Sequence, residues 1–98
     1  LNEGAVAIDA RRQVVRINEV GRLLLGVRQE PPFGLDLLPR ERTLRDAVDE
    51  ALAGRTPMAA EASIGERVVA LTARPLASGG AVLALYDLTP VRRLEAVR

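Results

Sequence analysis

The sequence contains no Cys, His, Lys or Trp, and only one Phe and one Tyr. Without Cys, disulfides and thiolate chemistry are excluded. Without His, the chain lacks the commonest metal ligand and the usual acid–base catalyst near neutral pH. Because aromatic residues are so scarce, the core must be built from Leu, Val, Ile and Ala.

The sequence also lacks long apolar runs and an excess of charge of one sign. No apolar stretch approaches the ~20 residues that span a bilayer, and nothing resembles a signal peptide. Fourteen arginines are interspersed with thirteen acidic residues, which leaves a net charge of +1. Because the charges are mixed, no stripe of one sign can follow a phosphate backbone, and we expect no nucleic-acid partner. Because long apolar runs are absent, we expect no direct membrane insertion of this segment.

What is present is typical of one globular domain. The chain has 98 residues, of which 48% are hydrophobic and 28% are charged. This length and composition fit a single soluble domain rather than a disordered segment. Because the first residue is Leu rather than Met, we expect a segment of a longer protein.

The first quarter of the chain predicts a β-hairpin followed by a short helix. Residues 5–9 and 14–18 are rich in β-branched side chains and are joined by four residues. Asn18 is a typical N-cap and Gly26 a typical stop, so we expect about two helical turns between them. The apolar side of this helix would consist of Leu23, Leu24 and Leu25.

The middle of the chain predicts a turn and then a longer helix. After the Pro31-Pro32 pair, one helical turn is expected to pack through Leu35, Leu37 and Leu38. Thr43 is the expected cap of the next helix, and Gly54 its end. Its apolar residues recur at helical spacing: Leu44, Ala47, Val48, Ala51 and Leu52.

Three strands are expected to follow, over residues 58–64, 67–76 and 81–88. Their short links favour antiparallel neighbours. We therefore predict an α+β fold with a five-stranded antiparallel sheet that carries short helices on one face and ends in a C-terminal helix. Since both faces of the last strands are apolar, we expect the second face to be covered by another copy or a flanking helix.

The pattern does not predict catalysis. Ser63 and Ser78 lie near expected turns, where local hydrogen bonds account for them. The acidic residues of the longer helix lie on its solvated side, and the glycines do not form a phosphate-binding loop. We expect no catalytic residue and no metal site, and so no enzyme activity from this segment alone.

The end of the chain is less easily explained as core structure. Asp87 ends the last strand, Thr89 can cap a new helix through its hydroxyl, and Pro90 suits the first helical position. Nine residues make only about 13 Å of helix, too short to be stable alone. We expect residues 1–89 to form the domain, and residues 90–98 to begin a linker helix leading to an output domain.

In order and spacing, these elements resemble a PAS domain over almost the whole chain, in particular the one that precedes the catalytic core of bacterial sensor histidine kinases of the phosphate-regulon type. Residues 4–9 and 14–18 match the first two strands. Residues 18–26 are similar to the family's "N-x-x-A-x-x-L-L-G" helix, and residues 87–89 to its "D-[IVL]-T" ending. Arg92, Arg93, Leu94 and Glu95 continue that match.

The resemblance implies a sensory or relay role. The domain would act as a homodimer in the cytoplasm, within an inner-membrane sensor protein. It would pass a conformational change through its last helix to the kinase core of the same chain, and so to a response regulator in a phosphorelay. Asp87, Thr89, Arg92 and Arg93 would be the signal-transmitting residues, and Asn18 the cap of the first helix.

The resemblance also limits which cofactors this chain could bind. Haem-binding relatives use an axial His and flavin-binding photosensory relatives use a Cys, and neither residue is present. Any ligand would be small, largely apolar and non-covalently held, in a pocket lined by Leu24, Phe33, Leu38, Val48 and Leu71. A core filled by its own side chains is an equal alternative.

Two residues depart from the family. Arg12 stands where a hairpin Gly is usual, and this predicts a rearranged turn, because Arg adopts a left-handed conformation only at a cost of roughly 1 kcal/mol or more. Gly21 replaces the usual Ala of the first helix and predicts a looser helix.

Three alternatives remain open. The first is a ligand-free dimerisation spacer in the same kinase. The second is a PAS domain attached to another output, such as a cyclic-di-nucleotide enzyme or a transcription regulator. The third is a small α+β interaction module of profilin-like architecture, which a parallel sheet or a missing first hairpin would favour.

Overall fold

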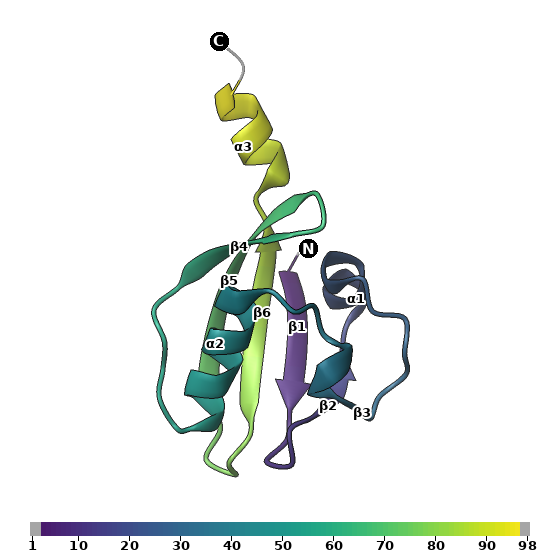
Figure 1. The fold of residues 1–98 in the computed structure, drawn as a ribbon, viewed down its shortest axis with the longest axis vertical. Helices are drawn as coiled ribbons and strands as arrows, with labels where there is room; N and C mark the ends of the chain where they lie inside the picture. The colour runs from purple at the N-terminus through teal and green to yellow at the C-terminus, as the bar shows by residue number, and fades with distance from the viewer. Residues whose placement is uncertain (1–2, 97–98) are drawn as a thin grey trace.

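The computed structural model describes residues 3–96, which form one antiparallel sheet with helices (Figure 1). The strand order is β3-β2-β1-β6-β5-β4. In chain order the elements are β1 (Glu3–Ile8), β2 (Gln13–Ile17), α1 (Glu19–Leu25), β3 (Phe33–Gly34), the 3₁₀ turn η1 (Leu35–Leu37), α2 (Arg42–Leu52), β4 (Ala60–Ile64), β5 (Arg67–Pro75), β6 (Ala81–Asp87) and α3 (Thr89–Ala96).

The predicted α+β fold class is confirmed. The first hairpin is present and every pairing is antiparallel, so the two features that would favour the profilin-like module are not found among these residues.

The sheet has six strands rather than the expected five. The additional strand, β3, has only two residues, which pair with Gln13 and Val14 of β2. A two-residue strand after Pro31-Pro32 has no alternation of its own, so only pairing with β2 defines it.

Helices α1 and α2 lie over the same face of the sheet, and α3 extends beyond the end of the strands (Figure 1). The covered face forms one core of aliphatic side chains and Phe33. Its most deeply buried large side chains are Ile8, Leu44, Leu71, Leu85, Val6, Val14, Val48 and Val69. Among the helices of residues 3–96, none has the length and hydropathy that crossing a bilayer requires.

The β1–β2 turn keeps its left-handed residue. Arg12 has φ 65°, so the predicted rearrangement is wrong. The Asp9 carboxylate compensates, because its Oδ1 accepts hydrogen bonds from the backbone N–H groups of Arg11 (2.9 Å) and Gln13 (3.0 Å). The Arg12 guanidinium also reaches Asp49 of α2 at 2.8 Å.

Asn18 fixes α1 to β1. Its Oδ1 accepts from the N–H groups of Gly21 (2.8 Å) and Ala5 (2.9 Å), and its Nδ2 donates to the Glu3 carbonyl (2.9 Å). The side chain therefore caps the helix and also binds the neighbouring strand. At the other end, Gly26 adopts φ 68°, and its N–H donates to the Arg22 carbonyl.

Gly21 is a packing residue rather than a source of looseness. It is buried, and a Cβ added at Gly4 of β1 would lie 3.0 Å from the Gly21 Cα. Two glycines facing each other let the helix backbone approach the strand closely. The expected apolar side of α1 was wrong at Leu23, which is 62% exposed, whereas Leu24 and Leu25 are buried.

The middle segment differs from expectation in two details. Leu35 and Leu38 are buried but Leu37 is 48% exposed, because a single 3₁₀ turn offers only one side to the core. Thr43 is not the cap of α2. Glu41 caps it instead, with its Oε1 accepting from the Leu44 N–H at 2.8 Å.

Candidate functional site

The junction between β6 and α3 is held by Asp87. One carboxylate oxygen, Oδ2, accepts from the guanidinium of Arg67 at 3.0 Å. The other, Oδ1, accepts from the backbone N–H of Thr89 at 2.9 Å. One side chain therefore joins the start of β5 to the residue that begins the helix.

The sheet ladder continues past the end of β6 through Thr89. In a regular antiparallel ladder, two opposite residues exchange both backbone hydrogen bonds. Leu88 N–H does donate to the Val68 carbonyl (2.7 Å), but the Leu88 carbonyl accepts from Arg92 N–H (2.9 Å) and so starts the helix. The Thr89 hydroxyl takes the place of that carbonyl and accepts from Val68 N–H at 2.8 Å. The sequence predicted a helix cap at Thr89, but the hydroxyl accepts from β5 instead.

Electrostatics favour the ionised carboxylate at this junction. The Asp87 side chain is only 21% exposed. Hydrogen bonds from Thr89, followed by the interaction with Arg67, lower the pKa of Asp87 below its ordinary value, against an opposing effect of desolvation. The charged form is therefore part of the structure, and protonation removes acceptors that the junction uses.

The two arginines of α3 differ in their surroundings. Arg92 forms an ion pair with Glu61 of the edge strand β4. Arg93 is exposed and lines an open cleft of ≈ 550 Å³ together with Glu66, Arg67, Asp87, Thr89 and Pro90. The four predicted signal-transmitting residues thus lie at one end of the sheet. Sequence reasoning missed their partners Arg67, Val68 and Glu61, because 20 to 31 residues separate each partner from the residue that it binds.

The five residues predicted to line a pocket lie together in the core. Their exposed fractions are 3% (Leu24), 5% (Phe33), 3% (Leu38), 2% (Val48) and 0% (Leu71). Their side chains offer no polar group, so an apolar ligand is the chemistry that they would suit. The small apolar ligand stays a prediction, and so does a core that these side chains fill themselves.

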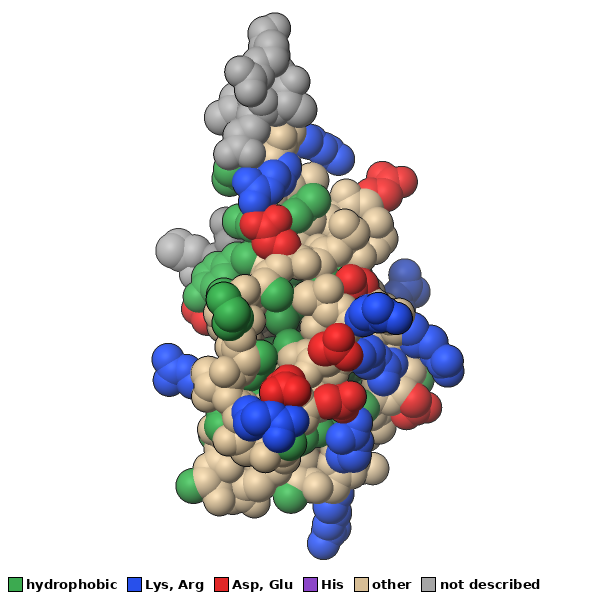
Figure 2. Space-filling view, turned by 60° about the vertical axis from the view of Figure 1, so that its left-hand side comes forward, with side chains coloured by type: hydrophobic (Ala, Val, Ile, Leu, Met, Phe, Trp, Pro, Cys, Tyr) green, Lys and Arg blue, Asp and Glu red, His purple; other side chains and the backbone are tan. Residues whose placement is uncertain are grey.

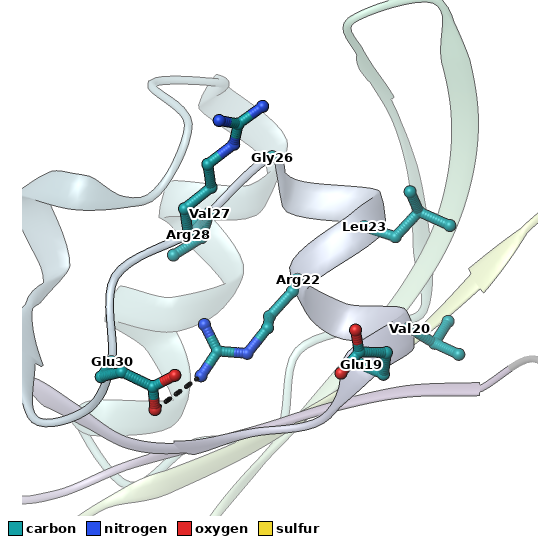
Figure 3. A pocket seen from close by; sticks show the side chains of 8 residues that line it. All are labelled: Glu19, Val20, Arg22, Leu23, Gly26, Val27, Arg28 and Glu30. Atoms are coloured by element: carbon teal, nitrogen blue, oxygen red, sulfur yellow. Dashed lines mark hydrogen bonds and ion pairs between the residues drawn. The ribbon is translucent and has the colours of Figure 1, made fainter.

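A larger open cleft, of ≈ 730 Å³, lies beside α1. Figure 3 shows that its side chains do not converge. Val20 and Leu23 point to one side of the helix, Arg28 points away, and Arg22 turns toward Glu30. The Arg22 guanidinium is occupied by the Gln29 carbonyl (2.8 Å) and the Glu30 carboxylate (3.4 Å). This surface does not bring reactive groups together, and within residues 3–96 no three acidic side chains gather as metal ligands would.

The sheet face opposite α1 and α2 has a centre of small and apolar residues and a charged margin. Burial and register place on it Ala5, Ala7, Ala70, Thr72, Val82, Ala84 and Tyr86. Register also places on it the charged residues Glu3, Arg16, Glu61 and Arg74. Tyr86 is 44% exposed, and its pKa is raised by hydrogen bonding to Glu3 at the margin of the face. On the part of the molecule that Figure 2 shows, hydrophobic side chains gather below α3 at the upper left, and acidic and basic groups are intermixed elsewhere.

Comparisons with known proteins support the fold. No family model matches the chain, and no curated protein matches it at a significant level. A solved structure, the sensor region of a sensor histidine kinase, superposes with a TM-score of 0.76 over 92% of this chain at 21% identity. The chain spans 40% of the length of that structure. The match establishes a sensor-domain-like α+β fold.

Replacing Thr89 by Val is expected to destabilise the domain. The substitution keeps the shape but removes the only hydroxyl at the junction, so Val68 N–H loses its described acceptor. Leaving a partly buried N–H unpaired costs roughly 1–3 kcal/mol, and urea unfolding followed by circular dichroism measures this. Thr89→Ser keeps the hydroxyl and is the matched control. Equal stability of the native and Thr89→Val chains would contradict the role of the hydroxyl.

Acid is expected to weaken the junction through Asp87. Because its folded pKa lies below the unfolded value of ~3.9, its stabilising contribution is fully present above that value and is lost as the pH falls through the folded pKa. The measurement is the free energy of unfolding of the native chain and of Asp87→Asn between pH 2.5 and 7. The difference between the two chains should shrink below about pH 4. A difference that stays constant over this range would show that ionised Asp87 does not stabilise the fold.

Proposed function

We propose that this chain is a PAS-type relay domain of a sensor histidine kinase, in which α3 carries the signal out of the sheet. The observation that carries the proposal is the junction at residues 87–89, where the β5–β6 ladder continues directly into the first helical hydrogen bond. The sensor-domain-like fold supports the same conclusion. The chain itself would be non-catalytic, and the phosphotransfer chemistry would belong to a kinase core in the same protein.

The junction suits transmission because it is rigidly attached to the sheet. Thr89 and Leu88 both bond to Val68, and Asp87 bonds to Arg67, so a shift or twist of β5 relative to β6 must move the first turn of α3. A continuing helix would deliver that movement as a rotation or translation within a parallel coiled coil. The energetic requirement is modest, since a coupling of ~1–3 kcal/mol makes a useful switch.

We further propose that the small-residue face of the sheet is where two copies associate. Ala5, Ala84 and Thr72 form its middle row, and the flat surface that they leave allows close approach of a second sheet. From standard strand spacing, strands β1, β6, β5 and β4 present roughly 20 Å by 20 Å, or about 400 Å². This is about half of the ~800 Å² per partner in a standard interface, so the dimer of this chain should be weak and concentration-dependent.

The remaining features of the proposal follow from the family. The parent protein would be an inner-membrane sensor with this domain on the cytoplasmic side, and its kinase core would phosphorylate a response regulator. A PAS domain that serves another output would use the same junction, since nothing in residues 87–89 is specific to kinases.

Asp87→Ala is expected to change the autophosphorylation of the intact kinase while this chain stays folded. The substitution removes both acceptors that tie the strand end to Thr89 and Arg67 and leaves only the bonds to Val68, so the helix would be coupled less tightly to the sheet. Phosphate incorporation from labelled ATP measures output, and circular dichroism measures folding. Asp46→Ala is the control, because Asp46 is an exposed carboxylate on α2, away from the junction. Unchanged output in a folded Asp87→Ala protein would rule out the relay role.

Ala84→Glu is expected to abolish self-association. The new carboxylate would lie in the middle row of the proposed contact face and would be desolvated there when a second copy binds. Sedimentation equilibrium over a range of concentrations measures the monomer–dimer equilibrium. Thr56→Glu, in the exposed segment between α2 and β4, is the matched control. A native chain that stays monomeric, or an Ala84→Glu chain that dimerises equally well, would refute this surface.

A further inference from the structure

A second attachment holds α3 to the sheet, one turn beyond the junction. Arg92 follows Thr89 by three residues, and its guanidinium reaches the carboxylate of Glu61 on β4. Leu88 and Thr89 bond to β5, whereas Glu61 belongs to the next strand outward. The start of α3 is therefore tied to two different strands.

The two attachments differ in strength. The junction contains three hydrogen bonds that use backbone groups, from Leu88, Val68 and Thr89. The Arg92–Glu61 pair is formed only by side chains that are 40% and 48% exposed. Pairs this exposed are weak and are screened by salt. The ion pair can therefore open while the junction stays intact.

Glu61 also lies on a strand that has only one neighbour in the sheet. β4 is an edge strand that pairs only with β5. It is reached from α2 through the exposed segment 53–59, whose beginning is tied back to α2 by the ion pair between Arg55 and Glu50 at 2.6 Å. α2 in turn covers the core through Leu44, Ala47, Val48 and Ala51. A displacement of α2 over the core would therefore be passed to Glu61 through the seven residues of segment 53–59.

We propose that the Arg92–Glu61 ion pair is a clasp that sets the direction of α3 relative to the sheet and couples it to β4 and α2. The junction acts as the pivot, and the clasp selects one orientation about it. With the clasp closed, α3 is held to the edge strand through Arg92 and Glu61; with the clasp open, α3 would sample a wider range of directions. The role of the clasp in signalling rests on the proposed function. The effect of the clasp on the direction of α3 can be tested in this chain alone.

The test measures the orientation of α3 with two spin labels. Because the chain has no Cys, labels can be placed cleanly at Asp46→Cys on α2 and Arg93→Cys on α3, both exposed positions. Double electron–electron resonance on labelled chain diluted with unlabelled chain gives the intramolecular distance distribution. Glu61→Gln is expected to broaden or shift this distribution, and 0.5 M NaCl should change the distribution of the native pair in the same direction. The charge-swapped variant Glu61→Arg/Arg92→Glu is expected to restore the native distribution.

Glu66→Gln is the matched control, since Glu66 is an exposed carboxylate in the neighbouring β4–β5 turn. A distribution that is the same in Glu61→Gln and the native chain would overturn the clasp. A change that Glu66→Gln reproduces, or that the charge swap fails to reverse, would overturn it as well. These outcomes are independent of the relay proposal, which the autophosphorylation of Asp87→Ala decides.

Discussion

The hydrogen bonds between Val68 and the start of α3 are the constraint on which the functional end of this molecule depends. A chain that leaves a sheet to begin a helix must direct the carbonyl of its last ladder residue into the helix. Here the Leu88 carbonyl turns to Arg92 N–H, and Val68 N–H would lose its partner. The Thr89 hydroxyl fills that position at 2.8 Å, so strand and helix share one continuous network. The Asp87 carboxylate links this network to β5 a second time, through its ion pair with Arg67.

The two faces of the sheet differ in the size of their side chains, and this difference has a physical consequence. The face under α1 and α2 carries Leu, Ile and Val side chains that form the core beneath the helices. The middle row of the opposite face consists of Ala5, Ala84 and Thr72, whose small side chains leave a flat surface there. Such a face tolerates exposure in a single copy and still permits close approach of a second one. Glycines perform a similar task on the inner face, where Gly4 and Gly21 bring α1 directly onto β1.

The proposed signal relay requires one contact that stays formed and another that can break. The junction holds, because its hydrogen bonds involve backbone groups and a carboxylate that is mostly shielded from solvent. The contact between Arg92 and Glu61 yields more readily, because both side chains are well exposed. An edge strand that supports the weaker contact adds to this difference, since β4 has one neighbour instead of two. In the proposed relay, motion would therefore be concentrated at α3, and the core would stay intact.

The sequence by itself determined the elements that depend on local chemistry. Asn18 and Gly26 delimit α1, the helical spacing from Leu44 to Ala51 defines α2, and alternation marks β5 and β6. Only the tertiary structure decided what depends on distant partners. β3 exists because β2 lies beside it, Leu23 is exposed because α1 is short and rests on Gly21, and Glu41 rather than Thr43 caps α2. The partners of Asp87, Thr89 and Arg92 come from β4 and β5, since strand pairing places residues far apart in sequence within hydrogen-bonding distance, and no local pattern encodes that proximity.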